Sequence, residues 1–145
     1  MSSFLNSLNI TGSALTAGRF RIDIISQNIA NISTTRTANG EPYRRKQVVY
    51  EERGLDFKRA LAEENYKLGL GGVRVTQVVE SDKPFVPVYN PAHPHADENG
   101  YVMMPNVNSA EEQVDLMAAT RAYEANITAL NVVKAMALKA LDIGR

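Results

Sequence analysis

Apolar residues recur at helical spacing along both ends of the chain, from about Phe4 to Ile32 and from about Val114 to Ile143. In the first segment the apolar positions repeat every seven residues, with a second set interleaved between them. A 3.5-residue period predicts a long helix with a coiled-coil type of seam. The seam positions are Leu8, Leu15, Ile22 and Ile29, interleaved with Phe4, Thr11, Gly18, Ile25 and Ile32.

Two glycines weaken this N-terminal helix. Gly12 and Gly18 lie in its interior, where each glycine costs about 1 kcal/mol relative to alanine. We therefore expect the helix to be marginally stable unless another helix packs against it.

The C-terminal segment carries its own start signal. Ser109 and Glu112 have the spacing of a capping box, in which the hydroxyl and the carboxylate bond free backbone N–H groups at the helix start. This predicts one continuous helix of about 50 Å, at 1.5 Å per residue. Its seven-residue repeat consists of Leu116, Tyr123, Leu130 and Ala137, flanked by Ala119, Asn126, Val133 and Ala140. Asn126 is either a buried residue that sets the register or an exposed polar residue.

The middle of the chain predicts short strands and turns. Gln47–Tyr50 and Val73–Val79 read as strands, the second after the glycines at 69, 71 and 72. The segment 56–68 reads as a short helix or a loop. Five of the six prolines follow between residues 84 and 105, which excludes helix and central sheet and predicts an extended, edge-like segment up to Asn108.

These elements predict a mainly α protein with a small β-rich insert, in which the terminal helices pair as an antiparallel coiled coil. The predicted division is 1–34 for the first helix and its cap, 35–108 for the irregular insert with 54–72 as a candidate variable loop, and 109–145 for the second helix. Antiparallel pairing follows if the insert returns the chain to its start.

Charge is balanced overall but unevenly distributed. The 145 residues have a net charge of zero, yet residues 1–50 hold six Lys/Arg and two Asp/Glu, and residues 51–100 hold six and nine. This division suits head-to-tail contact between copies better than nucleic-acid binding, which needs a concentrated basic face. Arg44, Arg45 and Lys46 form only a weak basic patch, so a solvated strand edge or an inter-copy salt bridge is favoured over a nucleic acid or a membrane.

The chain has no cysteine, which favours either the cytosol or stabilisation by assembly. The first residues lack the basic and apolar regions of a signal peptide, and no apolar run is long enough for a membrane helix. We therefore expect no membrane insertion, and any export to use another signal.

Catalytic chemistry has little support in the sequence. His93 and His95, near Asp97 and Glu98, are the only residues grouped like metal ligands, but they lie between prolines and lack a third ligand at helical spacing. Asp97–Gly100 reads as a turn. We expect no catalytic, cofactor-binding or metal-binding residues, no cofactor, and no enzymatic activity.

Three stretches carry a family resemblance. Residues 26–31 read Ser-Gln-Asn-Ile-Ala-Asn, followed by Thr34, and resemble the N-terminal signature of bacterial flagellar rod and hook proteins, although Ser33 replaces the usual asparagine. Residues 88–108, with Val-Tyr-Asn-Pro and Met-Pro-Asn-Val-Asn, and residues 121–126, Arg-Ala-Tyr-Glu-Ala-Asn, resemble the flagellar basal-body rod protein family, closest to its proximal rod type. The resemblance covers nearly the whole chain and is loosest between Glu51 and Gly72.

Membership of this family implies a structural subunit of the flagellar drive shaft. Such subunits are exported unfolded through the flagellar type III export apparatus and stack helically in the periplasm with copies of themselves and other rod proteins. The helices would then form the inner wall of the tube, and the insert, Tyr43 to Met104, would face outward or bridge neighbours. The alternatives are a discrete coiled-coil adaptor or chaperone subunit, or another flagellar rod or hook protein.

The expected assembly interface combines the helical seams with three asparagines. Asn28 and Asn31 are also expected to cap the first helix, because asparagine tolerates left-handed geometry and satisfies free carbonyls. The interface residues are Leu8, Leu15, Ile22, Ile25, Asn28, Ile29, Asn31, Leu116, Tyr123, Asn126, Leu130 and Val133.

Overall fold

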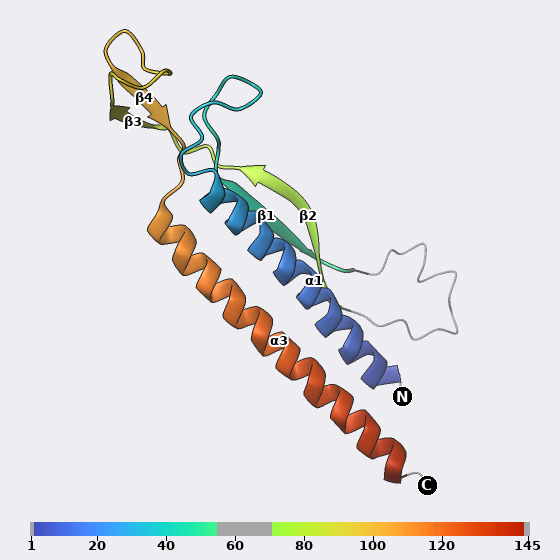
Figure 1. Ribbon diagram of the computed structural model, residues 1–145. Coiled ribbons are helices and arrows are strands. Elements are labelled where there is room, and N and C mark those ends of the chain that lie inside the picture. The colour runs from blue at the N-terminus through green and yellow to red at the C-terminus, as the bar shows by residue number, and fades with distance from the viewer. Residues whose placement is uncertain (1, 55–70, 144–145) are drawn as a thin grey trace. The chain divides into compact units, whose positions relative to one another are not determined.

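The computed structural model describes residues 2–54 and 71–143, and its regular structure is mostly helical (Figure 1). The predicted segment 56–68 lies outside the described residues. The described strands form two separate two-stranded sheets, β1 with β2 and β3 with β4. The helices and strands are α1 (Ser2–Ala30), β1 (Lys46–Glu52), β2 (Val73–Glu80), β3 (Val86–Tyr89), β4 (Tyr101–Met104) and α3 (Ser109–Ile143).

Both predicted helices and both predicted strands are confirmed. α1 ends two residues before the predicted Ile32, at Ala30. The seam positions whose side chains the structure describes are among the less exposed residues of both helices, except that Ala140 is exposed. Coiled-coil pairing of the two helices stays a prediction.

The start of α3 differs from the predicted capping box. Asn108, not Ser109, is the cap, because its Oδ1 accepts a hydrogen bond from the backbone N–H of Ala110 at 2.9 Å. The backbone N–H of Glu112 donates to the carbonyl of Asn108 at 3.0 Å. The Glu112 side chain turns away to partners far along the chain, so its predicted capping role is wrong.

The chain divides into two compact units. Unit 1 is Met1–Phe20, Val49–Thr76 and Ala119–Arg145, and unit 2 is Arg21–Val48 and Gln77–Ala118. Each unit takes a part of α1 and a part of α3. The predicted three-part division of the chain stays a prediction, since it follows secondary structure rather than contacts.

In unit 1 small residues allow close approach between elements. Gly18 faces Tyr123, since a Cβ at residue 18 would lie 3.6 Å from the Tyr123 ring. Ser13 Oγ accepts from the backbone N–H of Val73 at 3.1 Å, which fastens the start of β2 to α1. Gly72 has a φ of +114°, and a Cβ there would lie 2.6 Å from Ser13 Oγ.

In unit 2 the proline-rich segment forms a hairpin that the sequence did not predict. β3 and β4 pair antiparallel, with Val88 opposite Val102 and Tyr89 opposite Tyr101. Pro87 fits because both strands of a two-stranded sheet are edges. The predicted turn at 97–100 is confirmed, since the N–H of Gly100, at a φ of +80°, donates to the Asp97 carbonyl at 3.0 Å. Val102 faces inward and is 2% exposed.

We predict that Gly72→Ala destabilises the protein by at least about 2 kcal/mol. Alanine is strained at this positive φ, and its methyl group would collide with the Ser13 hydroxyl. Gly54→Ala is the matched control, because nothing lies within 4 Å of a Cβ at residue 54 and no left-handed φ is recorded there. Urea unfolding gives the free energy of unfolding of each variant. Equal losses of stability in the two variants would contradict the packing seen at Gly72.

Candidate functional site

A buried asparagine side chain near the end of α1 joins three segments of unit 2. Asn28 is 1% exposed. Its Oδ1 accepts from the Tyr43 hydroxyl and from the backbone N–H of Lys46, both at 2.9 Å. Its Nδ2 donates to the Lys46 carbonyl and to Glu112 Oε2, also at 2.9 Å. All four hydrogen-bonding positions of the amide are therefore used. The Asn28 side chain bonds both the N–H and the carbonyl of Lys46, as the backbone of a neighbouring β-strand would.

Glu112 supplies the acceptor at the centre of this site. It is 0% exposed, in the first turn of α3. One carboxylate oxygen accepts from Asn28, and the other accepts from Arg45 Nε in a salt bridge. A buried carboxylate is costly unless it is paired and hydrogen-bonded, and both conditions are met here.

Arg45 extends the pairing along α3. Its second guanidinium nitrogen donates to Asp115 Oδ2 at 3.0 Å. Burial of the guanidinium favours a lower pKa, but the hydrogen bond and charge of Glu112, with the charges of Asp115 and Glu111, outweigh it and raise the pKa of Arg45 above its ordinary value. Arg45 thus stays charged and holds the carboxylates of Glu112 and Asp115.

The backbone around Arg45 is held by a second buried amide. Asn106 Oδ1 accepts from the Arg45 N–H at 2.7 Å, and its Nδ2 donates to the carbonyls of Ser81 and Lys83 at 3.2 and 2.8 Å. The Ser81 N–H donates to the Arg45 carbonyl at 2.8 Å. We call Asn28, Tyr43, Arg45, Asn106 and Glu112 the polar joint. It connects the end of α1, the start of β1, the segment after β2 and the start of α3.

Tyr43 closes the polar joint on one side. It is 7% exposed, and its hydroxyl donates to Asn28. Burial, followed by the negative charges of Glu112 and Glu80, raises the pKa of Tyr43 from 10.0 to about 12. The hydroxyl therefore remains a donor throughout the neutral range.

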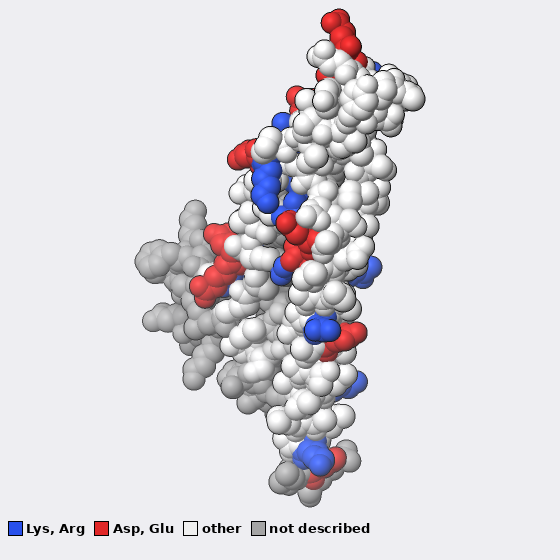
Figure 2. All heavy atoms as spheres, turned by 90° about the vertical axis from the view of Figure 1, so that its left-hand side faces the viewer, with Lys and Arg blue, Asp and Glu red and all other residues white. Residues whose placement is uncertain are grey.

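The described residues leave many apolar side chains in solvent. Only five hydrophobic residues are buried among them, whereas eighteen large ones are exposed. Several lie on α3, including Val114 at 60% and Met136 at 63% exposed. Figure 2 shows broad uncharged areas between the charged side chains on the visible face. Extensive exposed apolar surface is typical of proteins that pack against other proteins.

Comparison with known proteins shows the family to which the chain is related. Family models match residues 8–36, as "Flagella basal body rod protein", and 98–143, as "Flagellar basal body rod FlgEFG protein C-terminal". The flagellar basal-body rod protein FlgC of Bacillus subtilis is 46% identical over 100% of both chains. The proteins of that name from Borreliella burgdorferi and Salmonella typhimurium are 44% and 43% identical, over 95% and 99% of both chains.

The chain belongs to the FlgC family of flagellar basal-body rod proteins. The resemblance predicted from the sequence is confirmed. The polar joint draws on both matched regions, with Asn28 in the first and Asn106 and Glu112 in the second.

The two signature asparagines of this FlgC-family chain have different roles. Asn31 caps α1 as predicted, because its Nδ2 donates to the Gln27 carbonyl at 2.9 Å. The expected left-handed geometry is wrong, since no described residue other than glycine has a positive φ. Asn28 does not cap the helix but forms the polar joint.

The predicted interface residues are mostly half-buried along the two helices, and Ile25, at 6% exposed, is buried. The polar joint brings together only Asn28 of this set. Whether the set contacts other copies stays a prediction. The sequence did not predict that Tyr43, Arg45, Asn106 and Glu112 come together. Residues that bond one another in this group lie up to 84 positions apart in the chain, so no local motif indicates them.

The two histidines that are grouped like metal ligands in the sequence lie against each other. The rings of His93 and His95 pack edge to face, and the backbone N–H of His95 donates a hydrogen bond to His93 Nδ1 at 3.1 Å. Within residues 2–54 and 71–143, no group of three or more His, Cys, Asp or Glu side chains is arranged to hold a metal ion. Over the same residues neither helix has the length and apolar character needed to cross a membrane.

We predict that Glu112→Ala lowers the free energy of unfolding by about 3–5 kcal/mol, because it leaves the amide of Asn28 and the guanidinium of Arg45 without their acceptor. Glu124→Ala is the control, since Glu124 is exposed on the same helix and should change stability by no more than about 0.5 kcal/mol. Urea unfolding followed by circular dichroism compares the two. A small loss for both would show that the joint does not hold unit 2 together.

The raised pKa of Tyr43 predicts a pH-dependent difference from Tyr43→Phe. A folded-state pKa above the unfolded one gives stability that is present below pH 10 and is lost as the pH rises toward 12. Below pH 10 the native protein should be the more stable by about 1 kcal/mol, through the bond to Asn28. Between pH 10 and 12 it should lose on the order of 2 kcal/mol relative to Tyr43→Phe. If the difference in free energy of unfolding between the two proteins stayed constant from pH 10 to 12, the raised pKa of Tyr43 would be contradicted.

Proposed function

We propose that this chain is a structural subunit of the proximal part of the flagellar rod, which polymerises helically through its terminal helices and transmits torque. The relatives are named as basal-body rod proteins, which supports a place in the rod. The proposal assigns no enzymatic activity to the chain.

The exposed apolar surface of α3 is the observation that carries this proposal. Within unit 1, Ile127 at 38% and Val132 at 47% are exposed and lie five residues apart, which places them on different sides of a 3.6-residue helix. A helix that is apolar on more than one side is stable only inside a larger packed structure. Neighbouring subunits would supply that packing.

The heptad seams are the proposed contacts between helices. The seam residues of α1 and α3 are half-buried or buried over most of their length, so part of their surface remains for neighbours. We propose that the helices pair as an antiparallel coiled coil and that Leu8, Leu15, Leu116 and Leu130 contribute to contacts between subunits. A contact between two different surfaces that does not close produces an open helical filament, as a rod requires.

The proposed partners are other copies of the chain, the other rod proteins, and the flagellar export apparatus. The proposed location is the periplasmic rod. Export would occur through that apparatus, without a cleavable signal peptide, as the resemblance to rod proteins implies. Nucleic acid is not among the proposed partners, because the chain is neutral overall.

We predict that in-frame deletion of this chain in its source bacterium gives cells with membrane rings but without rod, hook or filament. Every distal part would lack the proximal rod on which it is built. Electron microscopy of extracted basal bodies and a swimming assay measure the outcome, and expression of the native chain is the control for complementation. Normal rods and swimming after deletion would reject the proposal and favour a discrete adaptor.

A further inference from the structure

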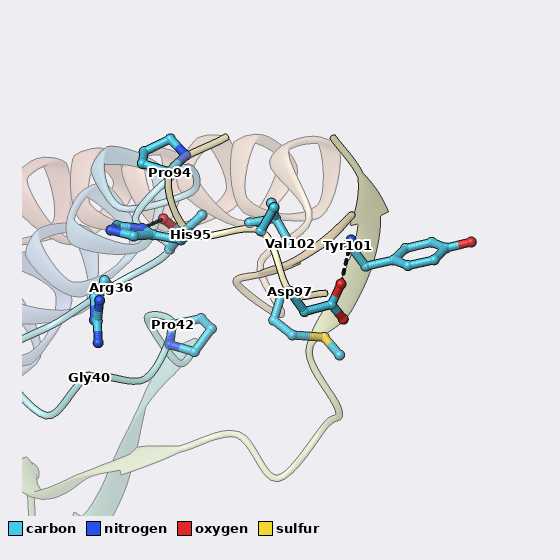
Figure 3. Close-up of a pocket in the computed structure, with 11 residues that line it drawn as sticks. Arg36, Gly40, Pro42, Pro94, His95, Asp97, Tyr101 and Val102 are labelled. Carbon is cyan, nitrogen blue, oxygen red and sulfur yellow. Dashed lines mark hydrogen bonds between the residues drawn. The ribbon is translucent and has the colours of Figure 1, made fainter. Parts of the chain in front are cut away.

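A cleft in unit 2 lies between the loop after α1 and the β3–β4 hairpin (Figure 3). It has a volume of about 430 Å³. Its apolar lining comes from Pro42, Val102 and Met103, and its polar lining includes Arg36 and His95. The cleft therefore offers apolar contact beside groups that bind an anion.

The cationic side of the cleft is available to a ligand. Arg36 is exposed, and no salt bridge joins it to another residue that the structure describes. The Thr35 hydroxyl lies 2.9 Å from His95 Nδ1, which positions the imidazole and leaves Nε2 for a ligand. Figure 3 shows Arg36 and His95 on the same side of the cleft. A guanidinium beside an imidazole is a suitable receptor for a carboxylate.

The one carboxylate in the cleft is already bonded. Asp97 Oδ1 accepts from the backbone N–H groups of Asn99 and Tyr101, at 3.0 and 2.8 Å. Figure 3 shows Asp97 beside Tyr101, on the opposite side of the cleft from Arg36. Asp97 thus stabilises the hairpin turn, and the charge of Arg36 remains to be matched from outside.

Unit 2 also carries a surface with the complementary chemistry. At the start of α3, Glu111, Val114 and Met117 are exposed, Val114 at 60% and Met117 at 54%. They are spaced three residues apart, so they follow one another on successive turns. Glu111 has no salt-bridge partner among the described residues. The surface thus presents one carboxylate beside two apolar side chains, which matches the cleft.

We propose that the cleft receives the start of α3 from a second copy of the chain. Glu111 of one copy binds Arg36 and His95 of the next, while Val114 and Met117 cover Pro42 and Met103. The cleft and the start of α3 are different surfaces of one unit, so the contact is head to tail and repeats without closing. The inference rests on the proposed rod function and names one contact within it.

Charge reversal tests the contact in the complemented deletion strain. Arg36→Glu and Glu111→Arg should each lower the number of complete basal bodies per cell by about tenfold, because each places like charges together. The double variant, which exchanges the two charges, should restore most of them. Arg21→Glu is the matched control, since Arg21 is exposed in unit 2 and does not line the cleft. Single variants without effect, or a double variant as poor as the singles, would overturn the inference.

Cysteine crosslinking gives an independent readout, because the chain has no native cysteine. In oxidised basal bodies, the combined Pro42→Cys and Val114→Cys variant should form dimers of twice the chain mass and longer ladders. Glu98→Cys with Val114→Cys is the control, because residue 98 does not line the cleft. Assembled rods without the first crosslink, or a crosslink to a different protein, would overturn the inference while leaving the rod function intact. If the cysteine variant fails to assemble, the charge exchange decides.

Discussion

The buried carboxylate of Glu112 is the constraint on which unit 2 depends. An ionised side chain without exposure to water is tolerated only if every oxygen has a donor, and Asn28 and Arg45 supply those donors. These two residues belong to segments that are far from α3 in sequence. The requirement to satisfy one carboxylate therefore fixes which residues of α1, β1 and α3 lie together.

This polar arrangement explains how a chain with few buried apolar residues keeps a defined fold. Hydrophobic burial is non-directional, whereas a hydrogen-bonded network admits one geometry. Asn28 uses both of its donors and both acceptor positions, and Asn106 holds the neighbouring backbone. The apolar side chains of α3 then need not form an internal core, and many of them remain exposed.

Periodic features of the fold could be predicted from the sequence, and long-range polar contacts could not. The seven-residue repeats predicted both helices, and β-branched runs predicted β1 and β2. The β3–β4 hairpin was missed because its prolines argue against a strand unless that strand is an edge. Glu112 was taken for a capping residue because Ser-x-x-Glu is a local signal, whereas its actual partners lie 67 and 84 residues away. The rod family could be recognised because its motifs are local in sequence.

The central claim is that the apolar surface of α3 is exposed in the free chain and covered in the rod. Hydroxyl-radical footprinting of Met117 and Met136, read by mass spectrometry, compares the two states directly. Both methionines are more than half exposed in the free chain. The account predicts strong labelling of both in the purified monomer and strong protection in isolated basal bodies. Equal labelling of Met136 in the two states would contradict it.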